Sequence, residues 1–125
     1  MTTNVGLWID HRQATIVTLT GGTEAIKQIT SSMEKHVRFA EGDEPGGEDV
    51  RDRRFANHLK AYFQEVIEQI RGADAIFIFG PGEAKGELSK RLDSENLGGH
   101  VVRVETVDKL TERQIAAKVR EHFQI

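Results

Sequence analysis

The chain has 125 residues, of which 38% are hydrophobic, and a formal net charge of -3. This length and composition predict one compact domain over residues 1–125. The chain has no cysteine, which excludes disulfides, thiolate metal sites and cysteine nucleophiles, and its charge gives no global attraction to nucleic acid or anionic membranes. The start, MTTNVGLWID, lacks the pattern of a signal peptide, and no apolar run approaches the ~20 residues of a membrane span, so we expect a cytoplasmic protein with no membrane partner.

The first third of the chain has the pattern of three β-strands. A short apolar run at 5–9 and a threonine-rich β pattern at 14–20 are separated by polar residues, which predicts a hairpin. The glycine pair at 21–22 predicts a second tight turn, because two adjacent residues free to take positive φ suit a hairpin connection. A third strand is expected over 25–29, and the apolar alternation at 33–39 continues it or forms a short extra strand.

The apolar pattern disappears between Ala40 and Arg53, where the segment EGDEPGGEDVRD is rich in glycine and acidic residues. Loops of ~12 residues or more inside small domains are usually functional or disordered, so this segment is a candidate functional loop. The alternative is a solvated connector without a binding role.

A long amphipathic helix is predicted from about Asp52 to Arg71. Gly72 follows it and is expected to cap its C-terminus. The spacing of the apolar residues keeps them on one helical face: Phe55, Leu59, Tyr62, Phe63, Val66, Ile67 and Ile70.

The stretch ADAIFIFGPGEAKGELSKRL is the predicted architectural centre of the chain. The uninterrupted apolar run from Ala75 to Phe79 indicates a strand covered on both faces, and a glycine-proline-glycine corner ends it. A helix is expected from about Pro81 to Leu92. Its inner face is predicted to carry Ala84, Leu88 and Leu92.

The last two predicted elements are a strand over His100 to Thr106 and a helix. The helix begins at a capping box, Thr111-Glu112-Arg113-Gln114, bracketed by Leu110 and Ile115 as a hydrophobic staple. Its buried stripe is expected to contain Ile115, Ala116, Val119 and Phe123.

The element order is therefore β-β-β-α-β-α-β-α. Three antiparallel strands followed by alternating helices and strands predict an α/β fold with an RNase H-like mixed sheet, in three layers with helices packed on the sheet. A flavodoxin-like sheet is the alternative, and it fits the hairpin-rich first third poorly.

An RNase H-like sheet prompts a search for carboxylates that hold two metal ions for phosphodiester cleavage. Asp10 follows the first strand and Glu83 follows the buried strand, so both are candidate catalytic residues of a metal-dependent nuclease. A third carboxylate is not evident. Asp10 also suits a hairpin turn, where aspartate is favoured because its side chain bonds nearby backbone amides.

The corner from Gly80 to Lys85 has only the outline of a phosphate-binding loop. Amides at a helix N-terminus attract anions, but the segment lacks the G-x-x-x-x-G-K-S/T spacing, and Glu83 would repel a phosphate. The five histidines form no metal-binding motif. We therefore expect no cofactor and no histidine metal site, and interpret the corner as a tight strand-to-helix turn.

Three short motifs together resemble a known family. Lys35-His36, then Gly46-Gly47-Glu48, then Arg54-Phe55-Ala56 at the start of a long helix resemble the middle domain of the eukaryotic and archaeal class 1 release factors. The stretch IFIFGPGEAKGEL is similar to the strand, glycine corner and following helix of those proteins and of their Pelota relatives. The resemblance implies the RNase H-like "translational machinery component" fold, here as a stand-alone domain.

The resemblance also implies a setting in translation. In the release factors a Gly-Gly-Gln loop enters the ribosomal peptidyl transferase centre and positions the water that hydrolyses peptidyl-tRNA. Here Gly46 and Gly47 match, but Glu48 replaces the glutamine, and the acidic loop would be repelled by RNA phosphates. We therefore expect a module that binds RNA or the ribosome without releasing peptide; a residual ester hydrolase with Glu48 as general base is an alternative.

The predicted RNA-binding surface surrounds this loop and the start of the helix. Its alternatives are basic residues that merely pair with the acidic loop, and a homo-oligomer in which the loop contacts a partner subunit. The candidate RNA-binding residues are Lys35, Arg38, Arg51, Arg53, Arg54 and Lys60.

Overall fold

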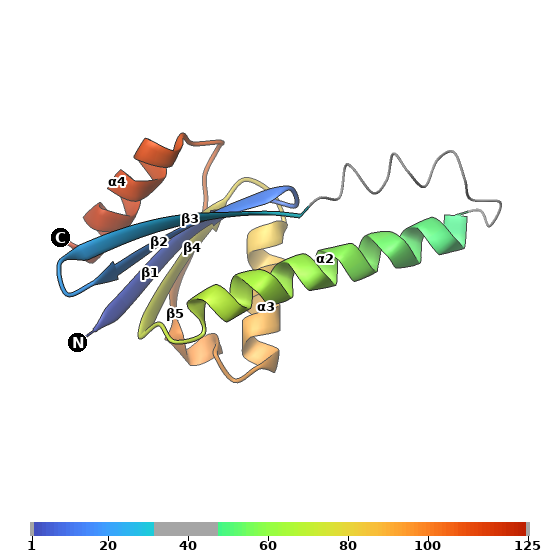
Figure 1. Cartoon of the computed structure of the whole chain (residues 1–125), viewed down its shortest axis with the longest axis horizontal. Helices are drawn as coiled ribbons and strands as arrows, with labels where there is room; N and C mark the ends of the chain where they lie inside the picture. The colour runs from blue at the N-terminus through green and yellow to red at the C-terminus, as the bar shows by residue number, and fades with distance from the viewer. Residues whose placement is uncertain (1, 32–47, 125) are drawn as a thin grey trace.

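The structure is a computed structural model that describes residues 2–31 and 48–124, with side chains from residue 57 onward in the second range. Five strands, three α-helices and one 3-10 helix make up this part of the chain (Figure 1). In order they are β1 (Thr3–Ile9), β2 (Gln13–Thr20), β3 (Thr23–Thr30), α2 (Glu48–Ile70), β4 (Ala75–Gly80), α3 (Ala84–Ser94), η1 (Gly98–His100), β5 (Val101–Thr106) and α4 (Glu112–Phe123).

The strands form one mixed sheet in the order β3-β2-β1-β4-β5. The two hairpins pair antiparallel, whereas β4 pairs parallel to both β1 and β5. This arrangement confirms the predicted mixed α/β class and the predicted order of elements. Strand β1 occupies the middle of the sheet, and β4, the strand predicted to be covered on both faces, lies beside it.

Helices cover both faces of the sheet: α2 and α3 lie on one face and α4 on the other (Figure 1). Alternate residues of a strand point to opposite faces, so β1 and β4 each supply two cores. Leu7 and Ile78 belong to the cluster under α2 and α3, whereas Trp8 and Phe77 belong to the cluster under α4. The three-layer architecture thus follows from two neighbouring strands that are apolar on both sides.

Gly6 allows α4 to pack close to the middle of β1. A Cβ atom built at this position would lie 2.3 Å from Cγ2 of Val119, far inside van der Waals contact. The glycine that interrupts the first apolar run therefore has a packing role. The buried side chain of Val119 occupies the space that a side chain at position 6 would need.

Helix α2 differs from its prediction at both ends. It begins at Glu48, so residues 48–53 are helical and the loop predicted over 41–53 is shorter than expected. It ends at Ile70, and the predicted glycine cap is wrong because Gly72 does not take a positive φ. The chain turns instead through a hydrogen bond from Ala73 N to Ile70 O of 3.1 Å.

The remaining predictions of local structure are largely confirmed. Both glycines of the β2–β3 turn have positive φ, 52° and 85°. Helix α3 begins at Ala84 instead of Pro81, because the corner takes up three residues before the helix starts. Helix α4 begins with the predicted capping box at Thr111. The alternation predicted over 33–39 lies outside the described residues.

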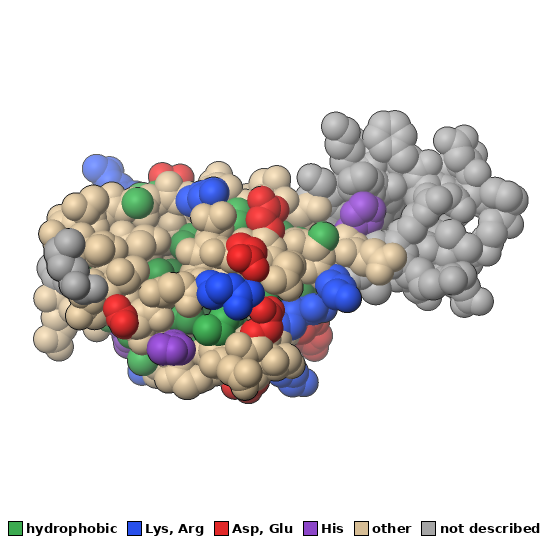
Figure 2. Space-filling view, turned by 60° about the horizontal axis from the view of Figure 1, so that its bottom comes forward, with side chains coloured by type: hydrophobic (Ala, Val, Ile, Leu, Met, Phe, Trp, Pro, Cys, Tyr) green, Lys and Arg blue, Asp and Glu red, His purple; other side chains and the backbone are tan. Residues whose placement is uncertain are grey.

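The face formed by α2 and α3 carries charges of both signs. Figure 2 shows basic and acidic side chains interspersed over the described part of this surface. Arg71 at the end of α2, for example, contacts Glu68 at 3.0 Å and Glu95 at 2.6 Å, and its hydrogen bond lowers the pKa of Glu68.

None of the helices in the described ranges combines the length and the hydrophobicity that a membrane-spanning helix requires.

Candidate functional site

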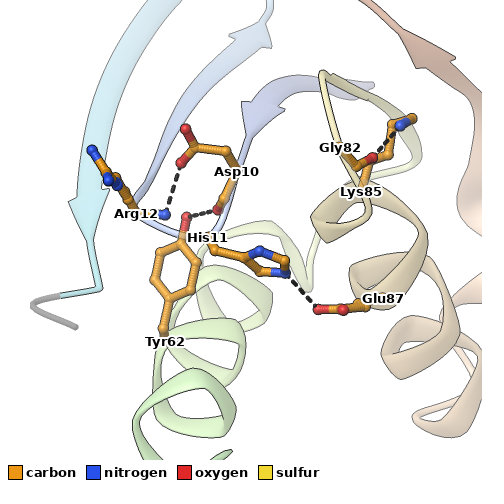
Figure 3. A network of polar contacts seen from close by, with 7 residues as sticks. All are labelled: Asp10, His11, Arg12, Tyr62, Gly82, Lys85 and Glu87. Atoms are coloured by element: carbon orange, nitrogen blue, oxygen red, sulfur yellow. Dashed lines mark hydrogen bonds and ion pairs between the residues drawn. The ribbon is translucent and has the colours of Figure 1, made fainter. Parts of the chain in front are cut away.

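The structure brings together the β1–β2 turn, the β4–α3 corner and the middle of α2. Strands β1 and β4 run parallel and side by side, so their C-terminal ends lie next to each other. Functional sites of α/β proteins commonly lie at this end of the strands. Figure 3 shows the residues that gather there: Asp10, His11, Arg12, Tyr62, Gly82, Lys85 and Glu87.

Asp10 organises the β1–β2 turn. Its Oδ1 atom accepts hydrogen bonds from the backbone N–H groups of Arg12 and Gln13, each at 2.8 Å. A further bond of 3.0 Å runs from Asp10 N to Gln13 O and closes the turn. Of the two roles that the sequence allowed for Asp10, this geometry fits the one in a hairpin turn. An aspartate side chain can replace a backbone acceptor in a tight turn.

Tyr62 ties α2 to the same turn. Its side chain is 2% exposed, and its hydroxyl donates a hydrogen bond of 2.9 Å to the backbone carbonyl of Asp10. Burial raises the pKa of the Tyr62 phenol, and the charge of Asp10 raises it further. The phenol is therefore neutral over the physiological range and serves as a fixed donor.

His11 extends from the turn to α3. Its Nε2 atom lies 3.0 Å from Oε2 of Glu87, and the two side chains are 41% and 37% exposed. Glu87 was not among the residues predicted for a site, and no partner was predicted for His11. No spacing rule connects them, because they are 76 positions apart and meet only through the parallel pairing of β1 and β4.

The β4–α3 corner is closed by close backbone packing. A Cβ atom at Gly80 would lie 2.2 Å from the carbonyl oxygen of Ile9, so only glycine fits at the end of β4. Lys85 donates a hydrogen bond from Nζ to the carbonyl of Gly82, so its ammonium group lies against the corner. Both contacts favour the interpretation of this corner as a tight turn.

The candidate nuclease residues occupy different local settings. Asp10 is tied into its own turn, and Glu83 is the exposed N-cap residue of α3 and makes no side-chain capping bond. Among the residues that the structure describes, no group of three or more histidine, cysteine, aspartate or glutamate side chains is arranged to hold a metal ion.

Most of the predicted RNA-binding surface lies outside what the structure describes. Gly46, Gly47, Lys35 and Arg38 fall in the segment between the described ranges. Lys60 is exposed on α2. The backbone of Glu48, Arg51, Arg53 and Arg54 belongs to the first turns of α2, in the part of the helix that extends beyond the sheet in Figure 1.

Known structures share this fold over nearly the whole chain. The Pelota protein of Thermoplasma acidophilum has a TM-score of 0.56 and 13% identity, with 98% of this chain and 31% of that chain covered. An archaeal translation termination factor, aRF1, has a TM-score of 0.56 and 17% identity, covering 98% and 40%. The Pelota of Archaeoglobus fulgidus has a TM-score of 0.60 and 14% identity, covering 96% and 31%.

The fold resembles one part of these proteins. This confirms, at the level of the fold, the resemblance to the release-factor and Pelota proteins that the sequence motifs indicated. The chain spans between 31% and 40% of the length of these three structures. No protein-family model matches the sequence, and no curated protein matches it.

Proposed function

We propose that this chain is a single-domain, cytoplasmic module of the translation apparatus that binds RNA or the ribosome and does not release peptide. The observation that carries the proposal is that α2 begins at Glu48, the residue that follows Gly46 and Gly47 in the sequence. Support also comes from the likeness to a translation termination factor and to Pelota over 96–98% of the chain.

The length of α2 supports a role for its first turns in contact with a partner. The helix has 23 residues, and at ~1.5 Å per residue this is ~35 Å, more than the sheet covers. Figure 1 shows its N-terminal part extending beyond the sheet. In the proposal, the basic residues at sequence positions 51, 53 and 54 contact RNA phosphates.

Glu48 argues against peptide release. The first two residues of α2, Glu48 and Asp49, are acidic, and the helix dipole favours negative charge at this end of a helix. The same charges would be repelled inside a site walled by RNA phosphates. In the proposal, binding therefore uses the basic residues of the helix, and the loop no longer enters a catalytic centre.

Ribosome co-sedimentation tests the binding. The parent chain is expected to pellet with ribosomes at low salt and to be released at high salt, because phosphate contacts release counterions. The triple variant Arg51→Ala, Arg53→Ala, Arg54→Ala is expected to pellet less at low salt. The triple variant Lys27→Ala, Lys109→Ala, Arg113→Ala removes the same charge elsewhere and is expected to behave as the parent. A parent chain that fails to pellet at both salts would overturn the proposal.

A peptidyl-tRNA hydrolysis assay tests the loss of release activity. The parent chain is expected to leave peptidyl-tRNA intact in the presence of ribosomes. Hydrolysis by the parent that disappears in Glu48→Gln would favour the alternative, in which Glu48 is a general base.

A further inference from the structure

Strand β5 is an open edge of the sheet. It pairs with β4 on one side, and no other strand of the described residues pairs with its outer side. An edge strand presents unpaired N–H and C=O groups that can pair with a further strand. Natural proteins often protect such an edge with charge or with proline, so the side chains of β5 decide how this edge behaves.

The exposed apolar side chains gather on this edge. Within the described ranges the large hydrophobic residues that remain exposed are Ile26, Val102 and Val104, and two of them belong to β5. Val102 is 54% exposed and Val104 is 42% exposed. An edge that combines free backbone groups with exposed valine is typical of a surface that pairs with another strand.

The pairing of β5 with β4 shows on which face of the sheet each β5 side chain lies. Val104 pairs with Ile78, which belongs to the core on the α2 and α3 side. Glu105 pairs with Phe79, which belongs to the core on the α4 side, and Arg103 lies on that side too, with its Nε atom 3.5 Å from Oε2 of Glu105. The strand therefore carries a valine on one face and an arginine–glutamate pair on the other.

We propose that β5 pairs antiparallel with β5 of a second copy of this chain, about a two-fold axis at Val104. In this register Val104 faces the partner copy's Val104, and Arg103 faces the partner copy's Glu105 in both directions. Opposite charges directly across an antiparallel pair stabilise it, and a two-fold interface must be self-complementary in this way. The two sheets then form one continuous sheet.

Charge disfavours the register in which the two-fold axis lies at Arg103. A two-fold axis at Arg103 would place two guanidinium groups directly opposite each other and Val101 opposite Glu105. Like charges directly across a strand pair destabilise it, so that register is disfavoured. Glu105 also contacts Lys118 of its own chain at 3.2 Å, and in the proposed register it lies between two cations.

The other edge of the sheet lacks this complementarity. A β3 pair about Ile26 would place Ala25 opposite Lys27, which is not a favourable pair. Glu24 at this edge already contacts Arg120 of α4 at 2.6 Å. Ile26 is nevertheless exposed to a similar degree, 39%, so it provides a matched control for changes at β5.

The first test is the mass of the full chain in solution, measured by sedimentation equilibrium over a range of concentrations. The parent is expected to form a dimer whose dissociation constant rises on the order of tenfold or more in Val104→Arg, because two guanidinium groups then face each other at the axis. Ile26→Arg is expected to dimerise as the parent does. A parent that stays monomeric at high concentration, or a Val104→Arg variant that dimerises unchanged, overturns the proposal.

The second test uses charge reversal and separates register from folding. Arg103→Glu alone and Glu105→Arg alone each place like charges opposite each other and are expected to be monomeric. An equimolar mixture of the two variants restores both opposite-charge pairs and is expected to form a heterodimer. Circular dichroism of each variant checks that it is folded. Two folded variants whose mixture stays monomeric would overturn the proposed pairing.

Discussion

Nε2 of His11 and Oε2 of Glu87 lie 3.0 Å apart and join the β1–β2 turn to α3. The hydroxyl of Tyr62 joins the same turn to α2 through the carbonyl of Asp10. A four-residue turn at the end of β1 is thus attached to both helices on one face of the sheet (Figure 3). The two attachments differ in burial, so they are expected to differ in energy.

The His11–Glu87 contact is expected to contribute little to stability. Both side chains are more than a third exposed, at 41% and 37%, so solvent screens the interaction. A double-mutant cycle with His11→Ala and Glu87→Ala is expected to give a coupling energy of about 0.2–1 kcal/mol by urea denaturation. The pair Arg71→Ala and Glu95→Ala provides a second surface contact for comparison, with side chains that are 43% and 29% exposed. A coupling of several kcal/mol would contradict the exposure of the pair.

The Tyr62 hydroxyl is expected to make protein stability fall at alkaline pH. Its pKa is raised in the folded protein, so ionisation is easier in the unfolded chain, where the pKa is near 10. The stabilising effect is therefore complete below about pH 10 and is lost above it, by about 1.4 kcal/mol per pH unit. Because the chain contains one tyrosine, tyrosinate absorbance reports this group alone.

The variant Tyr62→Phe isolates this effect. It is expected to lose about 1–2 kcal/mol near neutral pH, because the hydrogen bond to Asp10 O is removed. Its free energy of unfolding should then fall less steeply than that of the parent above pH 10. Tyrosinate absorbance that rises near pH 10 while the parent is still folded would show that the phenol is not held in its buried, neutral state.

Local signals were sufficient to predict most elements of the fold. The capping box of α4 is one example, because both of its hydrogen bonds join residues three positions apart, Thr111 and Gln114. The turn role of Asp10 is another, since the N–H groups that donate to its side chain belong to residues two and three positions later. Such contacts depend on the neighbouring sequence alone and can be inferred from it.

The site could not be predicted in the same way. His11, Tyr62 and Glu87 come from three segments, and their meeting depends on the parallel register of β1 and β4 and on the position of α2. Two glycines illustrate the same difference. Gly72 was predicted to cap α2 with a positive φ angle and does not have one, whereas Gly80 is required by its close approach to Ile9, which is distant in the sequence. Long-range packing is not encoded in local spacing.

Gly80 and Gly82 are expected to respond differently to the same substitution. In Gly80→Ala the new Cβ would lie 2.2 Å from the carbonyl oxygen of Ile9, so β1 and β4 must move apart, at a cost of about 2 kcal/mol or more. A Cβ at Gly82 meets no atom within 4 Å, so Gly82→Ala is expected to change the free energy of unfolding by less than ~0.5 kcal/mol. Equal effects in urea denaturation would show that the corner, and not the contact with Ile9, sets the requirement for glycine.

The start of α4 is expected to depend on the hydroxyl of Thr111. Its Oγ1 accepts a hydrogen bond of 3.1 Å from Gln114 N, and Thr111 N donates one of 2.9 Å to Oε1 of Gln114. Thr111→Ala removes the first bond and is expected to lower the free energy of unfolding by about 1 kcal/mol. Thr111→Ser keeps the hydroxyl and is expected to stay close to the parent. Because Val119 of this helix packs on Gly6, a loss shared by both variants would indicate a disturbed α4 interface and not a lost cap.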